Sequence, residues 1–216
     1  MTNVGLLFVG AVLFVNGASL LGAVLPRDSA PFNLFVGAMQ VIFPTLAILM
    51  GGASLEAGYA IGPIYLFGFT YLYVGINSLM GNSGTGLGWF SLFVAVMAVW
   101  VGITSLRTDP AFAVIWFVWA VMWTMFFLIL ALGHVALTPF TGWLLLLGSH
   151  ATATVPALLI FEDSWPTGTT AGNTAAVIAL VLIGGCVLLA NRRPALLGTA
   201  RPEAAPPPPA TTPTAG

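Results

Sequence analysis

Long uncharged apolar runs recur along this sequence, and they limit what it can fold into more than any other feature. Each run has about 20 residues, which is the length that an α-helix needs to cross a hydrocarbon core of roughly 30 Å. Breaks rich in Gly, Pro or charge separate the runs, as at residues 25–28 (LPRD) and 107–110 (RTDP). We therefore predict an all-α membrane protein with spans at residues 3–24, 32–51, 60–80, 88–106, 111–132, 142–161 and 172–190.

The scarcity of charged residues supports this prediction. Of the 216 residues, 59% are hydrophobic and 5% are charged, and none is a lysine. An ordinary soluble domain carries about 25% charged residues, so this chain could not cover a water-facing surface, whereas a bilayer favours an apolar exterior. The net charge of −1 argues against a nucleic-acid or acidic partner.

The content of cysteine and histidine limits the chemistry. Cys186 is the single cysteine and His134 and His150 are the two histidines, so the sequence predicts neither an internal disulfide nor a four-ligand zinc site. We find no nucleophile motif and no phosphate-binding glycine loop, so we expect no enzyme activity, metal or cofactor. The first run lacks a basic leader and a cleavage pattern, which predicts a retained span rather than a signal peptide.

Arginine placement predicts the orientation in the membrane. With the N-terminus outside, four arginines are cytoplasmic and one is external; the four are Arg27, Arg192, Arg193 and Arg201, and the external one is Arg107. Cytoplasmic loops carry the excess of Arg and Lys in membrane proteins. We therefore predict a multi-pass protein of the plasma (inner) membrane, with its N-terminus outside and its C-terminus in the cytoplasm. Residues 193–216, rich in Pro and Ala, are predicted to form a disordered cytoplasmic tail.

The acidic residues are also informative, because all six lie in loops or in the tail. Ion-coupled transporters and proton pumps usually place an acid within the membrane to bind the coupling ion. The pattern favours facilitated diffusion over pumping or cotransport, although backbone carbonyls can also bind sodium.

A weak internal repeat relates the second and fourth runs. Residues 32–36 (FNLFV) align with residues 90–94 (FSLFV), and residues 7–11 (LFVGA) recur at residues 34–38. Two interpretations stay open. One is a set of repeated helix hairpins around a common axis, and the other is chance recurrence of residues that are common in membrane chains.

Aromatic residues form the strongest local pattern. Those of the fifth run are spaced by 4, 3, 4 and 4, which stacks them along one helical stripe: Phe112, Trp116, Trp119, Trp123 and Phe127. Phe67 and Tyr71 form a similar stripe in the third run, with Thr70 beside it. Helix packing or lipid contact would explain such stripes. However, lipid-facing tryptophans prefer the membrane interface, so a stripe at mid-depth favours a position facing the bundle interior or a pore.

Several polar side chains fall at membrane depth, where an unpaired polar group costs several kcal/mol. We expect them to point inward, either as hydrogen bonds between helices or as part of a pore; they are Asn16, Gln40, Asn77, Thr124, Ser149, His150, Thr152 and Thr154. His150 has two interpretations, a pH gate or a neutral imidazole bonded to a neighbouring carbonyl.

Four stretches of the chain resemble the AmiS/UreI family of urea and short-chain amide channels. They are residues 9–17 (VGAVLFVNG), 66–73 (LFGFTYLY) with Ile76 and Asn77, 89–95 (WFSLFVA) and 115–123 (IWFVWAVMW). The LFGFTYLY string is specific, and a weaker match covers residues 138–157. The likeness extends over residues 1–165, which are predicted to be the channel domain. Residues 166–192 are predicted to add a transmembrane helix.

The resemblance implies a bundle of six pore-forming transmembrane helices in three hairpins, a pore inside each protomer and a hexameric ring. The predicted seventh, C-terminal helix is an addition. The implied constriction is aliphatic and aromatic, with Leu6, Val9, Leu13, Phe67, Tyr71, Trp116, Trp119 and Trp123. The polar pore candidates are Asn16, Thr70, Asn77, Thr124, Ser149, His150 and Thr152.

The expected function is passive conduction of small uncharged amides such as acetamide and urea, without a cofactor. The expected partners are those solutes, membrane lipids and further copies of the chain. Acid-gated channels of the family carry a glutamate in the sixth helix, where this chain has Gly148, and the loop before Tyr59 has no histidine. The amide-channel branch therefore fits better. A pH-gated urea channel and a non-conducting membrane sensor or accessory subunit are the alternatives.

Overall fold

A computed structural model describes residues 2–51 and 55–196. Most of the expected tail, residues 197–216 with Arg201, lies outside the described residues. Within them all regular structure is helical, which confirms the all-α prediction. The elements are α1 (Thr2–Leu20), α2 (Pro26–Gly51), α3 (Leu55–Met80), α4 (Thr85–Ser105), α5 (Pro110–Leu130), η1 (Val135–Leu137), α6 (Thr138–Ser149), η2 (His150–Thr154), α7 (Val155–Phe161) and α8 (Gly168–Arg192).

The helices correspond to the seven apolar runs. Five segments of the described chain are long and apolar enough to cross a membrane, and one of them, Val135–Phe161, joins η1, α6, η2 and α7. α1 supplies a shorter apolar helix, Val4–Leu20, and α3 has 26 residues. α2 starts six residues before the apolar run, because Pro26 and Asp28 are residues that favour the first turn of a helix.

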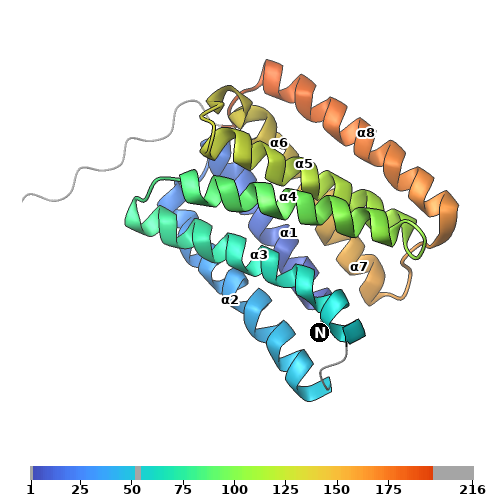
Figure 1. The fold of residues 1–216 in the computed structure, drawn as a ribbon. Coiled ribbons are helices and arrows are strands. Elements are labelled where there is room, and N and C mark those ends of the chain that lie inside the picture. The colour runs from blue at the N-terminus through green and yellow to red at the C-terminus, as the bar shows by residue number, and fades with distance from the viewer. Residues whose placement is uncertain (1, 52–54, 197–216) are drawn as a thin grey trace, which may run out of the picture.

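Three helix pairs build the bundle. α2 packs along α3, α4 packs along α5, and α1 packs along α6 (Figure 1). The first two pairs are hairpins of chain neighbours, whereas the third joins the first span to the sixth. The aligned segments, residues 32–36 and 90–94, lie in the first helix of each of these hairpins, which favours the repeat interpretation.

Glycine permits the close approach of α1 to the sixth span. A Cβ atom at Gly17 would lie 2.5 Å from the backbone nitrogen of Leu146, and one at Gly10 would clash with Thr154 Oγ1. Small residues at a helix contact let the backbones approach, which is how membrane helices gain packing energy without a hydrophobic driving force.

The sixth span contains a π turn, η2, in its middle. The backbone N–H of Val155 donates to the carbonyl of His150, five residues earlier, and Pro156 follows with no N–H of its own. Single π turns inside helices are often found at functional sites. Here the turn brings Thr152 into the buried interior of the bundle.

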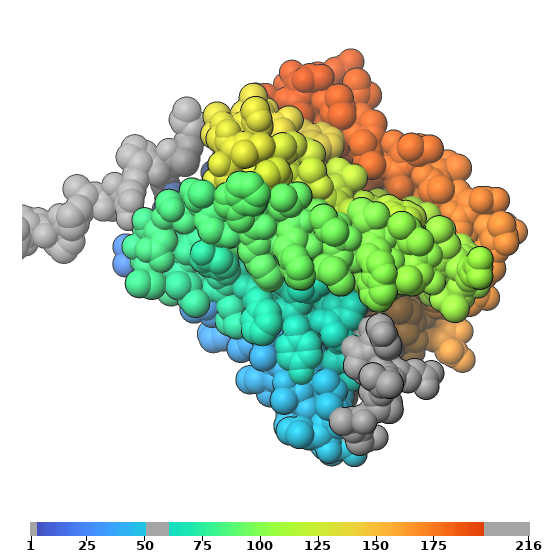
Figure 2. Space-filling view, in the orientation of Figure 1, coloured from blue at the N-terminus to red at the C-terminus, as the bar shows by residue number. Residues whose placement is uncertain are grey.

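α8 lies along α5 and α6 at one edge of the molecule, and α2 lies at the opposite edge (Figures 1 and 2). In the most apolar part of α8 only 6% of the residues are buried, so most of α8 faces outward. After α8 the polypeptide reaches the end of the bundle that holds the connection between α1 and α2. There Leu196 N donates to Leu21 O at 3.0 Å, and Trp143 Nε1 donates to Arg193 O at 2.7 Å.

Candidate functional site

Five aromatic side chains from α3 and α5 meet inside the bundle, and we call them the aromatic cluster: Phe67, Tyr71, Trp116, Trp119 and Trp123. The ring centroid of Phe67 lies 4.9 Å from those of Trp119 and Trp123, with interplanar angles of 74° and 89°. Trp116 lies 5.6 Å from Phe67 and 4.9 Å from Trp119. These are edge-to-face and tilted contacts, the arrangements that aromatic quadrupoles favour.

Helix periodicity explains why these residues converge. Trp116, Trp119 and Trp123 follow each other by three and four positions on α5, and Phe67 and Tyr71 are four positions apart on α3. All five are buried; Trp123, the largest residue type, is 2% exposed. The three tryptophans of α5 therefore face the protein interior and not the lipid.

The two ends of the α5 stripe have other contacts. Phe112 lies 6.0 Å from both Trp119 and Trp165, so it extends the aromatic cluster toward the loop before α8. Phe127 lies 5.2 Å from Trp89, which is an exposed residue of α4. The five residues of the stripe therefore do not share one environment. The three tryptophans lie at the centre of the aromatic cluster, whereas Phe127 contacts an exposed residue.

α1 adds aliphatic side chains to the same core. Val9 and Leu13 are buried in one contiguous core with the aromatic cluster, and Leu6 is half-buried against that core. The eight residues of the implied constriction therefore lie together in space, and their role in conduction stays a prediction.

Threonine hydroxyls fix the orientation of two indoles. Trp119 Nε1 donates to Thr152 Oγ1 at 2.9 Å, and Trp123 Nε1 donates to Thr70 Oγ1 at 3.2 Å. Each threonine in turn donates its own proton to a helix carbonyl, Gly148 O at 2.6 Å and Leu66 O at 2.7 Å. Both hydroxyl protons and both indole protons are used in hydrogen bonds. The two threonines therefore hold the rings of Trp119 and Trp123 in place.

The Tyr71 hydroxyl is different. Tyr71 is 2% exposed, and among the described residues its hydroxyl oxygen is buried with no hydrogen-bond partner. A buried hydroxyl that lacks a partner costs about 1–3 kcal/mol, and such groups are rare enough in proteins to require an explanation. Tyr71 therefore places a polar group without a described partner within the aromatic cluster.

Asn16 forms hydrogen bonds between helices, one of the two expected roles, and its role as a pore-lining amide stays a prediction. Asn16 and Asn33 exchange two hydrogen bonds, of 2.9 and 2.8 Å, and Asn33 also donates to Ser29 O at 3.0 Å. Gln40 adds a bond to Gly5 O at 2.9 Å. These amides join α1 to α2. Asn33 is fully buried, but it stands at the edge of the second apolar run, where the sequence carries no signal that would pair it with Asn16.

Three further polar candidates bond locally. Thr124 Oγ1 donates to Ala120 O at 2.8 Å, and Ser149 Oγ donates to Leu146 O at 2.7 Å. Asn77 contacts the loop after α3, where its Nδ2 lies 3.5 Å from Ser83 O. Hydrogen bonds of this kind satisfy a polar side chain within its own helix or turn, and the role of these three residues in a pore stays a prediction.

The expectation that His150 points inward is wrong for the single chain. Its side chain is exposed, and its ring centroid lies 5.4 Å from that of Phe14, another exposed residue. His150 begins the π turn, and buried Thr152 and Ala153 follow it, so the imidazole occupies the outer side of the sixth span. The sequence showed the depth of His150 but could not show this face.

Membrane-length helices around a buried aromatic core define a multi-pass membrane protein whose polar and aromatic groups converge inside a single bundle. Comparison with known proteins identifies the class more narrowly. The sequence model of the AmiS/UreI family transporter matches residues 1–164. The chain belongs to the AmiS/UreI family.

Three relatives are similar over most of their length. A candidate amidate substrates transporter of Mycolicibacterium smegmatis is 48% identical over 191 residues, which are 87% of this chain and 88% of the relative. The candidate transporter AmiS2 of Rhodococcus erythropolis is 48% identical over 198 residues, with coverages of 91% and 96%. The crystal structure of the urea channel of Helicobacter pylori matches with a TM-score of 0.70 and 34% identity, over 77% of this chain and 100% of that one.

Proposed function

We propose that this chain is a passive channel for small uncharged amides such as acetamide and urea, which cross the bundle beside the aromatic cluster. The observation that carries the proposal is the interior position of the three tryptophans together with the free hydroxyl of Tyr71. The relatives support the substrate class, since one is named for amidate substrates and another is a urea channel.

The aromatic cluster suits a flat neutral solute. An amide that enters an apolar medium without hydrogen bonds loses roughly 4–8 kcal/mol. Ring faces can stack on the amide plane, and the Tyr71 hydroxyl can donate to the amide oxygen, so this loss is partly offset. The ring of Phe67 contacts the rings of both Trp119 and Trp123. Passage therefore requires them to part, which keeps the slot narrow.

The same slot opposes ions. Within the described residues, the charged positions lie in loops or at helix ends, as with Arg27, Asp109 and Glu162. An ion beside the aromatic cluster would meet no counter-charge from these residues, and its desolvation cost far exceeds that of a neutral amide. A channel of this kind conducts the solute and preserves the proton gradient.

An acid gate at the sixth span is disfavoured because this chain has no carboxylate at residue 148. Gly148 occupies the position that matches the glutamate of acid-gated channels, and a Cβ there would lie 2.5 Å from Met122 Cε. A carboxylate side chain would need Met122 to move. Gated urea conduction is therefore the weaker alternative for this chain.

The orientation we propose places the N-terminus outside. Hydrogen bonds join the segment after α8 to the end of α1 and to Trp143, so Arg27, Arg192 and Arg193 belong to one end of the bundle. The positive-inside rule makes that end cytoplasmic. Residues 1–165 form the channel domain, 166–192 add α8, and the chain assembles as a hexamer, as the family resemblance implies.

Osmotic swelling of proteoliposomes tests the function. Vesicles containing the purified full chain should admit acetamide and urea faster than empty vesicles, and a trapped pH dye should show no proton leak. Flux equal to that of empty vesicles would contradict the proposal and favour a sensor or accessory subunit.

A further inference from the structure

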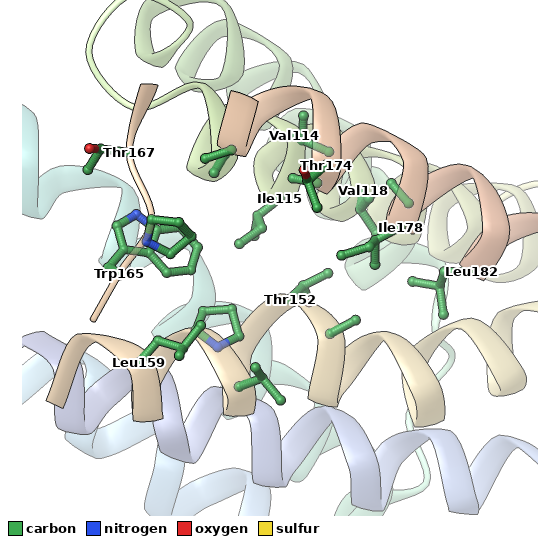
Figure 3. A pocket seen from close by; sticks show the side chains of 18 of the residues that line it. Val114, Ile115, Val118, Thr152, Leu159, Trp165, Thr167, Thr174, Ile178 and Leu182 are labelled. Carbon is green, nitrogen blue, oxygen red and sulfur yellow. The ribbon is translucent and has the colours of Figure 1, made fainter. Parts of the chain in front are cut away.

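A cavity lies between α5, the η2–α7 segment and α8. Its volume is about 390 Å³, and Ile115, Thr152, Leu159, Trp165 and Ile178 are among the residues that line it (Figure 3). That size falls in the range of about 300–1,000 Å³ that is typical of ligand sites. Trp116, Trp119 and Trp123 are not among its lining residues, so this cavity is distinct from the centre of the aromatic cluster and meets it through Thr152.

The cavity is built by a helix outside the region that the family model matches. That model ends at residue 164, whereas the α8 wall begins after it. Gly172 of α8 permits this contact with the bundle, because a Cβ there would lie 2.6 Å from Pro110 Cβ. The site is therefore a property of α8 together with the bundle.

The α8 wall changes from polar to apolar along its length. Thr167, Thr170 and Thr174 line the cavity near the start of the helix, and Ile178 and Leu182 line it deeper. Figure 3 shows Thr167 at one end of the cavity and Leu182 at the other. A wall with hydroxyls at one end and hydrocarbon at the other matches an amphiphile that enters with its chain first.

The cavity reaches the lipid-facing surface. Val155 of α7 and Ile178 of α8 both line it, and they are 49% and 52% exposed. Inside a bilayer the medium at that surface is acyl chain. An apolar cavity stays dry and binds apolar groups, so hydrocarbon from the adjacent leaflet is the available occupant.

Local charge distinguishes a free fatty acid from a phospholipid as the source of the acyl chain. Among the described residues no charged side chain lines the cavity, and the charged residues nearest its polar end in sequence are the acids Asp109, Glu162 and Asp163. Asp109 Oδ2 accepts a hydrogen bond from Trp165 Nε1 at 2.9 Å, so one acid is fixed at that end. Against the single Arg107 of the α4–α5 connection, these three acids leave a net negative charge that would repel the carboxylate of a free fatty acid. A phospholipid keeps its headgroup outside and inserts a neutral chain.

We propose that this cavity is a binding site for one acyl chain of a membrane phospholipid, held between α8 and the channel domain. The acyl chain of the lipid lies along Val118, Pro156 and Ile178, and the lipid headgroup lies near the threonines at the start of α8. The acyl chain packs against Thr152, whose hydroxyl accepts the hydrogen bond from Trp119.

Photolabelling in proteoliposomes tests the proposal. The probe is a phosphatidylethanolamine with a diazirine in the middle of one acyl chain, incorporated with the full-length protein. We expect mass spectrometry to place the label on the α7 and α8 peptides at cavity residues such as Leu159 and Ile178. Excess oleic acid should not compete. Label confined to outward residues such as Val181, or full competition by oleic acid, would overturn the proposal.

Neighbouring alanines supply a matched pair of variants. Ala175 lines the cavity, whereas Ala176 does not. Ala175→Leu fills the space and should lose most of the cavity label, and Ala176→Leu should keep it. Ala171→Leu, at a second lining position, guards against a folding defect in one variant. Equal labelling of all three variants, or replacement of lipid label by a crosslink to a second copy of the chain, would contradict the proposal.

Discussion

The indole N–H of Trp119 donates to Thr152 Oγ1 at 2.9 Å, and this bond joins the centre of α5 to the π turn of the sixth span. It connects an aromatic side chain of the proposed slot to a residue that lines the α8 cavity. The orientation of the Trp119 ring therefore depends on a hydroxyl that is 33 positions away in sequence.

Replacing that hydroxyl should disturb the aromatic cluster. Thr152→Val keeps the shape of the side chain but leaves the Trp119 N–H without an acceptor, at a cost of about 1–3 kcal/mol. Thermal unfolding in detergent should show a lower midpoint, and acetamide flux should change with it. Thr152→Ser keeps the acceptor and should behave like the parent. Thr124→Val is the control, because that hydroxyl bonds Ala120 O of its own helix. Equal effects of Val and Ser at position 152 would contradict the assignment.

Removal of the Tyr71 hydroxyl separates conduction from stability. Because this hydroxyl is buried and lacks a described partner, Tyr71→Phe should leave the unfolding midpoint unchanged or raise it. Loss of a hydrogen bond worth about 0.5–1.5 kcal/mol should lower acetamide flux by about 2- to 13-fold. Stopped-flow swelling measures the flux and thermal unfolding measures the stability. An unchanged flux would mean that the hydroxyl does not contact the solute.

The reciprocal amide pair of α1 and α2 should act on stability alone. Asn16→Ala and Asn33→Ala each leave one buried amide without its partner. The double variant should lose less stability than the two single variants combined, with a coupling of about 0.6 kcal/mol and at most about 1.7 kcal/mol, the average and the maximum found for polar pairs between membrane helices. Unfolding midpoints in detergent of the parent, the two single variants and the double variant complete this double-mutant cycle. A coupling of zero would show that the pair does not hold the two helices together.

Orientation can be read with a membrane-impermeant maleimide. Glu162→Cys should label in intact cells, whereas Arg27→Cys should label only after permeabilisation, because the two positions lie at opposite ends of the bundle. The native Cys186 is fully buried and should give little background. The reverse pattern would place the N-terminus in the cytoplasm.

Much of the fold follows from periodicity alone. Seven apolar runs predict the spans, and the spacing of Trp116, Trp119 and Trp123 predicts their shared face, because a helix fixes the direction of residues three and four positions apart. The interior position of that face is also predictable, since tryptophan at mid-depth disfavours lipid.

The rest depends on contacts between distant segments. Nothing in the spacing pairs Trp123 with Thr70, 53 positions earlier, or Asn16 with Asn33. The π turn shifts the register of the sixth span, so a regular helix would misplace Thr152 and His150. The α8 cavity arises from the fit of two surfaces, which no single run of sequence describes.

The most direct test of the central claim is acetamide flux through proteoliposomes that contain Trp119→Ala or Trp123→Ala. Each change removes one ring that would contact the solute, an interaction worth about 0.5–1.5 kcal/mol, so acetamide permeability should fall by about 2- to 13-fold while the protein stays assembled. Trp89→Ala is the matched control, because Trp89 is exposed on α4 and the flux through this variant should equal that of the parent. If Trp119→Ala and Trp123→Ala both conduct acetamide like the parent, the buried rings serve packing alone and the account is contradicted.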